Sequence, residues 1–154
     1  KKFDITGLDI SEDALRIYKR ENPGNKVIHG SIFDIPAKDK SYDCIYNLGV
    51  MEHFREEEIY EILKELKRAL KDDGKLVIFW PPGYGSSVLF LKGVSFVLNN
   101  ILRQNIWLHP DEVSRIKSKK WAENIFRKSG FKVKRYYFGI KDMFTQVVII
   151  AEKI

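Results

Sequence analysis

A group of residues that could bind a ligand stands in the sequence SYDCIYNLGVMEHF, which covers residues 41–54. Apolar and aromatic residues fill its first half, and this pattern predicts a buried strand from Tyr42 to Asn47. Polar or conformationally free residues then follow abruptly, namely Asn47, Gly49, Glu52 and His53. In open α/β sheets ligands bind outside the carboxyl ends of the strands, where loops and helix N-termini meet. We therefore expect a binding site at residues 47–53.

The pair Glu52 and His53 could also take part in a reaction. A histidine side chain titrates near neutral pH, so His53 could accept a proton from a hydroxyl group or an acidic carbon of a substrate. Glu52 could contact the same substrate. The structural alternative, which is the commonest explanation for such a pair, is a glutamate that caps a helix and a histidine that packs beside it.

A second candidate is Asp9, which follows the strand pattern FDITGL of residues Phe3 to Leu8. A carboxylate held on the rigid end of a strand can accept two hydrogen bonds from the diol of a ribose. Ile10 would then flank that ribose. The alternative is that Asp9 caps the next helix, but Ser11 is placed to fill that role.

The elements that would position these residues alternate between strand and helix patterns. The clearest helix pattern repeats apolar residues at helical spacing from Glu56 to Lys71. Residues Phe131 to Phe138 and Thr145 to Glu152 are two strand-like runs with a short connection, which predicts an antiparallel hairpin. Alternating strands and helices predict an α/β fold whose parallel sheet carries helices on both faces. The other expected elements are a helix that begins after Ser11 and ends at Asn22, strands Lys26–His29 and Lys75–Trp80, and a helix between Ser118 and Gly130.

The composition narrows the class of protein. A chain of 154 residues with 44% hydrophobic and 13% aromatic residues suits one domain with a substantial core. Cys44 is the single cysteine and lies in an apolar strand, so we expect inert packing, no disulfide and a cytoplasmic location. The net charge of +6 could attract an anionic partner, but the lysines are scattered, so nucleic acid is not favoured. We expect no signal peptide and no membrane-spanning segment, because these residues contain no run of apolar residues long enough to cross a bilayer.

In order and spacing, four segments resemble the class I S-adenosylmethionine-dependent methyltransferases, in particular the small-molecule branch that includes quinone-biosynthesis methyltransferases. The segments are TGLDISEDAL, HGSIFDIP, SYDCIYNLGVMEHF and LKRALKDDGKLVIFWPP. They are similar to the second to fifth strands of that fold with their following residues, and the terminal hairpin fits its last two strands. The resemblance implies a Rossmann-like sheet, S-adenosylmethionine as cofactor and a small molecule as methyl acceptor.

The resemblance also implies positions for the cofactor-binding residues. Ser31 and Ile32 fall where the family contacts adenine, through a side chain at the first position and a backbone amide at the second. Many relatives have an acid at the first position, and Asp34 either substitutes for it or is only a loop residue. Asn47 and Leu48 would line the cofactor near its sulfonium, mostly through backbone carbonyls. The alternative for Asn47 is a turn residue at the end of a strand.

Residues 47–53 differ from two groups of relatives in ways that bear on the metal requirement and the substrate. Some relatives hold a divalent metal with the Glu and His of such a pair and further ligands, but Gly49 occupies the place of another Glu, so we expect no metal site. The NLGV of residues 47–50 lacks the paired prolines of amine-directed methyltransferases. This difference disfavours a nucleobase amine as the methyl acceptor.

The family's first strand and Gly-rich loop have no match in these residues, so the pattern begins at the second strand. That first strand lies at the centre of the sheet. Its absence would leave unpaired backbone groups on two neighbouring strands, at a cost of about 1 to 3 kcal/mol for each group. We expect a fragment of a longer protein, a rearranged sheet, or a gap closed by another chain, of which a homodimer is one form.

We expect one methyltransferase-like domain over residues 1–154, with an inserted lid or substrate segment at residues 83–117. This segment contains the mostly apolar, helix-like run Val88 to Leu102, which suits a hydrophobic or aromatic acceptor. Tyr84, Trp107 and His109 are candidates for contact with that acceptor, although one Trp and one His in such a segment are more often structural. The run could instead pack against a neighbouring molecule or a membrane surface.

Three functions follow from these patterns. The first is S-adenosylmethionine-dependent methyl transfer to a small, hydrophobic or aromatic acceptor. The second is a non-catalytic domain that acts as a scaffold or dimer module, because the Gly-rich loop has no match. The third is a fragment of an NAD-binding dehydrogenase, in which Asp9 would bind the ribose, but the terminal hairpin disfavours it.

Overall fold

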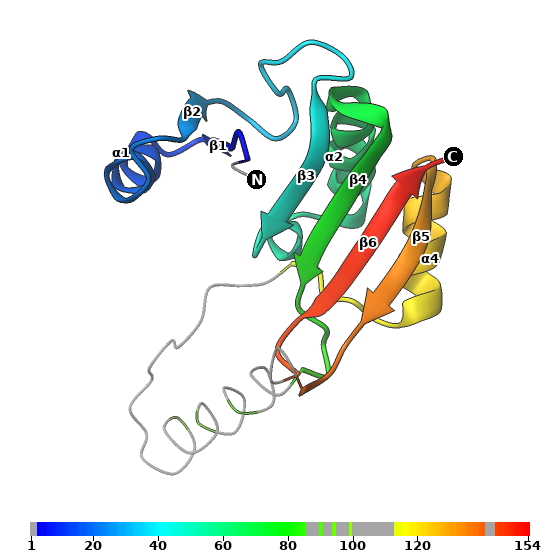
Figure 1. Cartoon of the computed structure of the whole chain (residues 1–154). Coiled ribbons are helices and arrows are strands. Elements are labelled where there is room, and N and C mark those ends of the chain that lie inside the picture. The colour runs from blue at the N-terminus through cyan, green and yellow to red at the C-terminus, as the bar shows by residue number, and fades with distance from the viewer. Residues whose placement is uncertain (1–2, 86–89, 91–93, 95–98, 100–112, 141–143) are drawn as a thin grey trace.

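The computed structural model describes residues 3–85, 90, 94, 99, 113–140 and 144–154 of the chain (Figure 1). Its elements, in chain order, are β1 (Thr6–Asp9), α1 (Glu12–Glu21), β2 (Lys26–His29), β3 (Tyr42–Leu48), the 3-10 helix η1 (Met51–His53), α2 (Glu56–Ala69), β4 (Leu70–Trp80), α4 (Lys119–Lys128), β5 (Phe131–Tyr137) and β6 (Val147–Lys153). The predicted alternation of strands and helices is confirmed. No helix that the structure describes is both long and apolar enough to cross a lipid bilayer.

The strands form two sheets. β1 and β2 pair in parallel as a two-stranded sheet, and the other four strands form a second sheet in the order β3-β4-β6-β5. In the second sheet β3 and β4 are parallel, whereas β6 runs antiparallel to both β4 and β5, so the predicted terminal hairpin is confirmed. In Figure 1 the unit of β1, α1 and β2 lies beside β3. β1 and β3 do not pair with each other, so the two sheets are separate.

Burial of Leu70 moves the boundary between α2 and β4. Helix α2 ends at Ala69, two residues before its predicted end, and β4 begins at Leu70 rather than at Lys75. The side chain of Leu70 is fully buried, and a Cβ at Gly74 would come within 2.7 Å of it. A side chain at position 74 would therefore collide with Leu70, and glycine avoids this collision.

The two faces of the four-stranded sheet differ in burial. Helices α2 and α4 lie behind the sheet in Figure 1 and cover the face with the fully buried side chains of Leu76, Ile78, Trp80, Val147, Ile149 and Ala151. The sequence predicts helices on both faces, but none of the described helices packs on the other face. The prediction that residues 42–47 form a buried strand is wrong for Cys44 and Tyr46, which are exposed because they point to that uncovered face, as does Leu48 at the end of β3.

Candidate functional site

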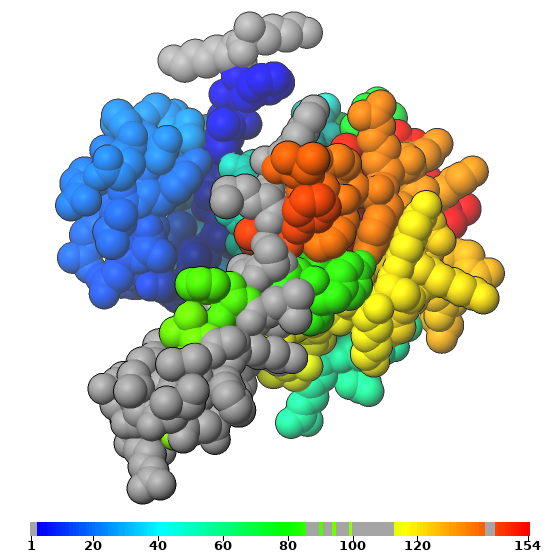
Figure 2. Space-filling view, turned by 90° about the horizontal axis from the view of Figure 1, so that it is seen from below, coloured from blue at the N-terminus to red at the C-terminus, as the bar shows by residue number. Residues whose placement is uncertain are grey.

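The loops that follow β1, β2 and β3 contact each other. The Gly30 N–H donates a hydrogen bond to the Asp9 carbonyl oxygen at 3.0 Å, which joins the ends of β1 and β2. The rings of Phe33 and Phe54 pack edge to face with centroids 5.2 Å apart, which joins the loops after β2 and β3. Figure 2 looks at the edge where β3 and β4 end, with the N-terminal unit (blue) beside the rest of the chain. These contacts link the loops that follow the three strands.

Asp9 shapes the turn from β1 into α1 and keeps one oxygen accessible. Its Oδ1 accepts a hydrogen bond from the Ser11 N–H at 2.8 Å, and the Ser11 hydroxyl accepts one from the Ala14 N–H at 3.2 Å. The predicted capping role of Ser11 is therefore confirmed. No described residue donates a hydrogen bond to Oδ2 of Asp9, and the side chain is exposed. A ligand that donates hydrogen bonds could bind this oxygen.

Ile10 has an apolar side chain next to Asp9, and 72% of the surface of Ile10 is exposed. The carbonyl oxygen of Ile10 lies 2.9 Å from Nε2 of His29 and accepts a hydrogen bond when that nitrogen carries the proton. The sequence carries no signal for this role of His29, because one histidine at the end of a strand has many explanations. The contact fixes the position of Ile10 relative to the end of β2.

Ser31 and Ile32 make different contacts within the chain. The Ser31 hydroxyl accepts a hydrogen bond from the Phe33 N–H at 3.2 Å, so it serves the turn after β2 but can still donate its own proton. Ile32 is half-buried and packs against the main core. The Asp34 side chain is exposed, and its backbone N–H donates to the Ser31 carbonyl oxygen at 3.2 Å.

An ion-pair network holds the loop after β2 on helix α2. Arg68 donates to Glu65, to Asp39 and to the carbonyl oxygens of Ile35 and Ala37, at distances between 2.6 and 2.9 Å. Glu65 accepts a further hydrogen bond from the Ile35 N–H at 2.8 Å. Its hydrogen bonds with Arg68 hold the pKa of the Glu65 carboxyl below the usual value. The network fixes the loop that carries the predicted adenine-contacting residues.

Asn47 has a buried side chain without hydrogen bonds. It pairs with Ile78 across β3 and β4, so its side chain points to the face that α2 covers. Oδ1 and Nδ2 of Asn47 are both buried, and neither has a partner among the described residues. An unsatisfied buried polar group costs about 1 to 3 kcal/mol and is rare unless water or a ligand satisfies it. The adjacent Leu48 points the other way and is 62% exposed.

The turn after β3 depends on Gly49, whose φ of +68° is unfavourable for residues with a side chain. It leads into η1, where Met51 is fully buried and Glu52 is 7% exposed. Among the residues that the structure describes, Glu52 is the one buried residue that carries a charge. His53 is exposed, so its imidazole is accessible to a substrate. The two residues of the predicted pair therefore differ in exposure: Glu52 is buried and His53 lies on the surface.

The segment around Ser114 ties this loop to the loop after β4. The N–H groups of Val113 and Ser114 donate to the Glu52 carbonyl oxygen at 2.8 and 3.0 Å. The Ile116 N–H donates to the carbonyl oxygen of Pro81 at 3.1 Å. The sequence has no pattern that predicts these contacts, because they join backbone groups of distant segments. They give η1 a fixed position at the edge of the sheet.

Four aromatic side chains gather at the ends of β4 and β5, namely Tyr84, Tyr136, Phe138 and Phe144. The ring of Phe138 packs edge to face against Tyr84 and Phe144, with centroids 5.2 and 5.4 Å apart. The hydroxyl oxygens of Tyr84 and Tyr136 are 3.1 Å apart. Burial and this hydrogen bond raise the pKa of Tyr136, so its hydroxyl stays protonated at neutral pH. The predicted substrate residue Tyr84 is thus part of an aromatic cluster.

The remaining predicted substrate residues, Trp107 and His109, lie outside the described residues, as does most of the run Val88 to Leu102. Within the described residues, no three His, Cys, Asp or Glu side chains come together as a metal ion would require.

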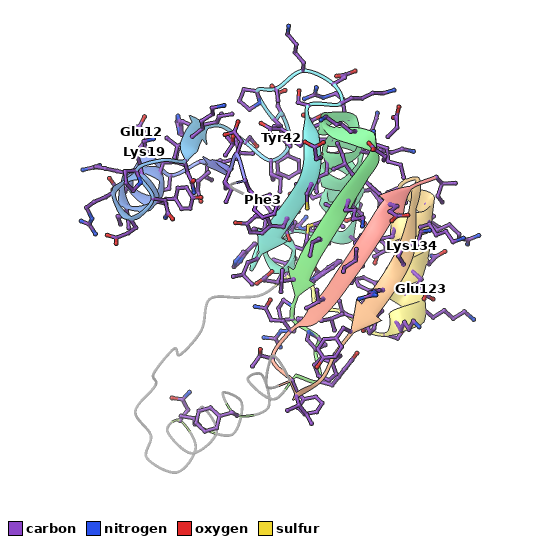
Figure 3. All side chains as sticks on the ribbon, in the orientation of Figure 1. Phe3, Glu12, Lys19, Tyr42, Glu123 and Lys134 are labelled. Carbon is purple, nitrogen blue, oxygen red and sulfur yellow. The ribbon has the colours of Figure 1, made fainter. Side chains whose placement is uncertain are left out.

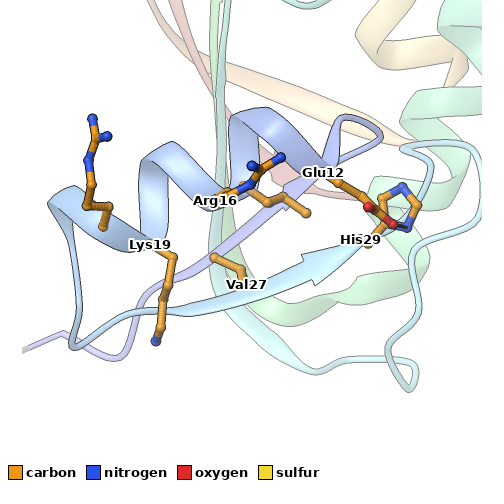
Figure 4. A pocket seen from close by; sticks show the side chains of 7 residues that line it. Glu12, Arg16, Lys19, Val27 and His29 are labelled. Atoms are coloured by element: carbon orange, nitrogen blue, oxygen red, sulfur yellow. Dashed lines mark ion pairs between the residues drawn. The ribbon is translucent and has the colours of Figure 1, made fainter.

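A separate open groove of about 540 Å³ lies between α1 and β2 (Figure 4). It is lined by Glu12, Leu15, Arg16, Lys19, Arg20, Val27 and His29. None of the predicted cofactor-binding residues lines it. The charges of Arg16 and Arg20 are paired with neighbouring acids of the same helix, so the groove offers few free charges to a ligand.

Comparison with known proteins identifies the family. Residues 1–78 match the model of the family described as "Methyltransferase domain". The demethylmenaquinone methyltransferase of Thermotoga maritima is 33% identical over 76 residues, which are 49% of this chain and 32% of that protein. The crystal structure of the PH0226 protein from Pyrococcus horikoshii has a TM-score of 0.68 at 20% identity, and the match covers 99% of this chain and 72% of that chain. An O-methyltransferase of neocarzinostatin biosynthesis, NcsB1, was solved with S-adenosylhomocysteine and 1,4-dihydroxy-2-naphthoic acid; its TM-score is 0.70 at 13% identity, over 99% of this chain and 42% of that chain.

These matches differ in what they establish. The similar solved structures show the fold, because their sequence identities are low. The chain spans between 32% and 47% of the length of the curated relatives that it matches. The family model covers half of the chain, and the covered half contains all the predicted cofactor-binding residues from Asp9 to Leu48. This chain belongs to the methyltransferase domain family.

Proposed function

We propose that this chain binds S-adenosylmethionine at residues 9–10, 31–32 and 47–48 and takes part in methyl transfer to a small molecule. One observation carries the proposal: the amide of Asn47, at the end of β3, is buried without a partner. The loops that follow β1, β2 and β3 are linked to one another by a hydrogen bond and a ring contact. A ligand with both donors and acceptors would satisfy this amide. S-adenosylmethionine has such groups.

The residues present suit the adenosyl part of this cofactor. Oδ2 of Asp9 can accept hydrogen bonds from ribose hydroxyls, and Ile10 and Ile32 offer apolar contacts to the ribose and the adenine. The amide of Asn47 can both donate and accept. A Gly-rich loop of the kind that holds the methionine part has no match in these residues.

When bound, S-adenosylmethionine would supply a methyl group on a positively charged sulfur: the acceptor atom would bond to the methyl carbon as the carbon–sulfur bond in line with it breaks, with S-adenosylhomocysteine as the leaving group. The contribution of the protein is to hold the acceptor in that line, which is worth an effective molarity of about 10⁵ M or more. The backbone hydrogen bonds that Val113 and Ser114 make to Glu52 keep η1 fixed for this purpose. His53, on the surface of η1, accepts the proton if the acceptor is a hydroxyl group.

The aromatic cluster supports a hydrophobic or aromatic acceptor. Tyr84 is 44% exposed and Phe144 is 43% exposed, so each offers part of an aromatic ring to a planar molecule. Aromatic acceptors also fit the relatives, because NcsB1 was solved with a dihydroxynaphthoic acid and another relative is a demethylmenaquinone methyltransferase. We therefore place the acceptor in the quinone-like class of small molecules.

A non-catalytic role as a scaffold or dimer module is the second candidate. The free edge of β3 and the uncovered face of the sheet favour it, because both can bind another polypeptide.

Isothermal titration calorimetry with S-adenosylmethionine and S-adenosylhomocysteine tests the proposal. We expect saturable binding that Asp9→Ala weakens by about 1.5 to 3 kcal/mol, the cost of a lost charge-assisted hydrogen bond. Asp9→Asn keeps an acceptor for the Ser11 N–H, so it separates the loss of charge from the loss of the turn. Asp4→Ala is the matched control, because Asp4 is an exposed acid of the same unit, paired with Lys26.

The contrary outcomes are distinct. If Asp9→Ala bound the cofactor with unchanged affinity, the only role of Asp9 would be to stabilise the turn before α1. Saturable binding of NAD in place of the methyl donor would favour the dehydrogenase reading. Absence of any binding by a folded chain would favour the non-catalytic role.

A further inference from the structure

The hydroxyl oxygens of Tyr84 and Tyr136 are hydrogen-bonded at 3.1 Å, and either residue could be the donor. Each hydroxyl carries one proton, and the hydrogen bond uses one of the two protons. The two side chains come from separate parts of the chain, the loop after β4 and the strand β5. The residue that keeps the second proton decides what this aromatic cluster can bind.

Burial indicates that Tyr136 is the donor. Tyr136 is half-buried and packs against the main core, whereas Tyr84 is 44% exposed. Within the described residues, Tyr84 is the one hydrogen-bond partner of the Tyr136 hydroxyl. If Tyr84 were the donor, the more buried proton would have no acceptor, which costs free energy. If Tyr136 is the donor, the second proton belongs to the exposed hydroxyl of Tyr84.

The surroundings of Tyr136 favour the same direction. Its partner in β6 is the buried Ile149, so Tyr136 points to the face of the sheet that α4 covers. Burial, the hydrogen bond to Tyr84 and the negative charge of Glu123 all raise the pKa of Tyr136. Glu123 lies on α4 beside β5 (Figure 3). Tyr136 therefore keeps its proton at neutral pH and can donate it to Tyr84.

The chain holds Tyr84 in place at three points. Its backbone lies in a turn in which the Gly85 N–H donates to the Pro82 carbonyl oxygen at 3.1 Å. Its ring packs edge to face on Phe138, and its hydroxyl is bonded to Tyr136. An oxygen that accepts a hydrogen bond on one side carries its own proton on the other. The Tyr84 hydroxyl is therefore a donor whose direction is fixed by the fold.

A fixed donor on an exposed aromatic ring fits one kind of molecule. Phe144 packs on the same ring of Phe138 and is 43% exposed, so Tyr84 and Phe144 both offer ring surface to a flat apolar molecule. The proton of Tyr84 needs an oxygen with a lone pair, such as that of a carbonyl or a carboxylate. A bound ring without such an oxygen would leave this donor unpaired.

We propose that Tyr84 selects aromatic methyl acceptors that carry a carbonyl or carboxylate oxygen, by donating its hydroxyl proton to that oxygen in a hydrogen bond. Tyr136 is a positioning residue that holds the Tyr84 hydroxyl in the donating orientation. The inference rests on the proposed function, because that function makes the bound molecule a methyl acceptor. The alternative is that the two tyrosines only join the loop after β4 to β5.

Two probes that differ in one group test this selection on the whole chain. They are 6-acetyl-2-naphthol and 6-ethyl-2-naphthol, which share the fused rings and the hydroxyl group; the carbonyl of the first is a methylene group in the second. Neither carries a formal charge at neutral pH, so the net charge of the chain favours neither. Calorimetry gives both dissociation constants, with and without S-adenosylhomocysteine. Because the ethyl group is more apolar, the informative quantity is how a variant changes the ratio of the two constants.

Tyr84→Phe keeps the ring and removes the donor. We expect it to weaken the acetyl probe about three- to tenfold and to leave the ethyl probe within about twofold. Tyr136→Phe leaves the Tyr84 hydroxyl without its orienting partner, so it should cause a smaller loss that is also confined to the acetyl probe. Tyr137→Phe is the matched control, because Tyr137 is the next residue of β5 and points to the opposite face. It should bind both probes like the unaltered chain.

Infrared spectroscopy measures the same hydrogen bond without a variant. The carbonyl stretch of the acetyl probe should move to lower wavenumber on binding than in an apolar solvent, and Tyr84→Phe should remove this shift. This readout also serves if circular dichroism shows that a variant does not fold. A carbonyl stretch in the bound probe that matches the apolar solvent would overturn the proposal.

Two further results would overturn it. They are equal losses for both probes in Tyr84→Phe, which would leave the tyrosine pair a structural role, and no binding of either probe by the folded chain. Calorimetry with S-adenosylhomocysteine keeps the proposed function separate. A chain that binds the cofactor but neither probe loses this inference and keeps its cofactor site, whereas probe selection without cofactor binding contradicts the proposed function alone.

Discussion

At the end of β3, the side chains of Asn47 and Leu48 point to opposite faces of the sheet. Buried polar groups normally have hydrogen-bond partners and large apolar side chains are normally buried, and neither residue follows this pattern. The amide of Asn47 is buried without a partner, while the apolar side chain of Leu48 is exposed. We attribute the first departure to a polar ligand in the proposed site. The second follows from the strand register, which turns Leu48 toward the face of the sheet that no described helix covers.

Asn47→Leu separates binding from stability at this position. An apolar side chain of similar shape removes the unsatisfied amide, so we expect the free energy of unfolding to stay the same or rise by up to about 1 to 2 kcal/mol. The affinity for S-adenosylhomocysteine should fall. Urea unfolding and calorimetry measure the two effects. If the variant were instead less stable by more than about 1 kcal/mol, Asn47 would have a structural role.

His53→Ala tests the assignment of the base. Because His53 is exposed on η1 and lines no part of the adenosyl site, its loss should leave the affinity for S-adenosylhomocysteine unchanged. With a hydroxyl acceptor, turnover should fall by about 10² to 10⁴-fold, the usual contribution of a general base. A rate assay with radiolabelled methyl donor checks this. An unaltered rate would exclude His53 from proton transfer.

At the scale of elements, the loop after β2 is held in place by the contact between α2 and Ile35. Glu65 accepts a hydrogen bond from the Ile35 N–H and is bound on its other side by Arg68. The carboxylate is therefore needed in its charged form to keep the loop on the helix.

This need predicts a pH dependence of stability. The pKa of Glu65 is lower in the folded chain than its ordinary value of 4.5, because Arg68 hydrogen-bonds to the carboxylate. Its contribution is therefore complete above that ordinary value and disappears as the pH falls through the lowered pKa. Urea unfolding between about pH 6 and about pH 3 should show a stability advantage over Glu65→Gln that shrinks with acid. The exposed Glu61→Gln is the control and should follow the unaltered chain; a constant advantage of the chain over Glu65→Gln would contradict this account.

The elements themselves could be predicted where local signals exist. Ser11 and Ser118 begin helices as predicted, because serine caps act within three residues. The network of Glu65 and Arg68 could not be predicted, since it joins residues about thirty positions apart. The exposure of Tyr46 was also beyond prediction, because an apolar strand does not reveal which of its faces another element covers.

At the scale of the whole molecule, the chain consists of a small N-terminal unit and a larger body. Each strand of the first unit has four residues, and Leu15 is the one buried hydrophobic residue of β1, α1 and β2. The larger body contains nearly all of the core cluster. Two-stranded sheets are marginally stable alone, so the candidate site lies between parts of unequal stability.

Native-state hydrogen exchange should reveal this inequality. We expect the amides of β1 and β2 to exchange by local opening, well below the free energy of global unfolding, and those of β4 and β6 to exchange only by global unfolding. Saturating S-adenosylhomocysteine should slow exchange in β1 and β2. Equal protection of the two sheets without ligand would show that they unfold as one unit.

A crystal structure of the chain with S-adenosylhomocysteine tests the central claim most directly. The account predicts ribose hydroxyls within hydrogen-bond distance of the Asp9 carboxylate, adenine beside Ile32, and a hydrogen bond from the ligand to the amide of Asn47. A ligand bound in the groove between α1 and β2, or one that left Asp9 and Asn47 without contact, would contradict it.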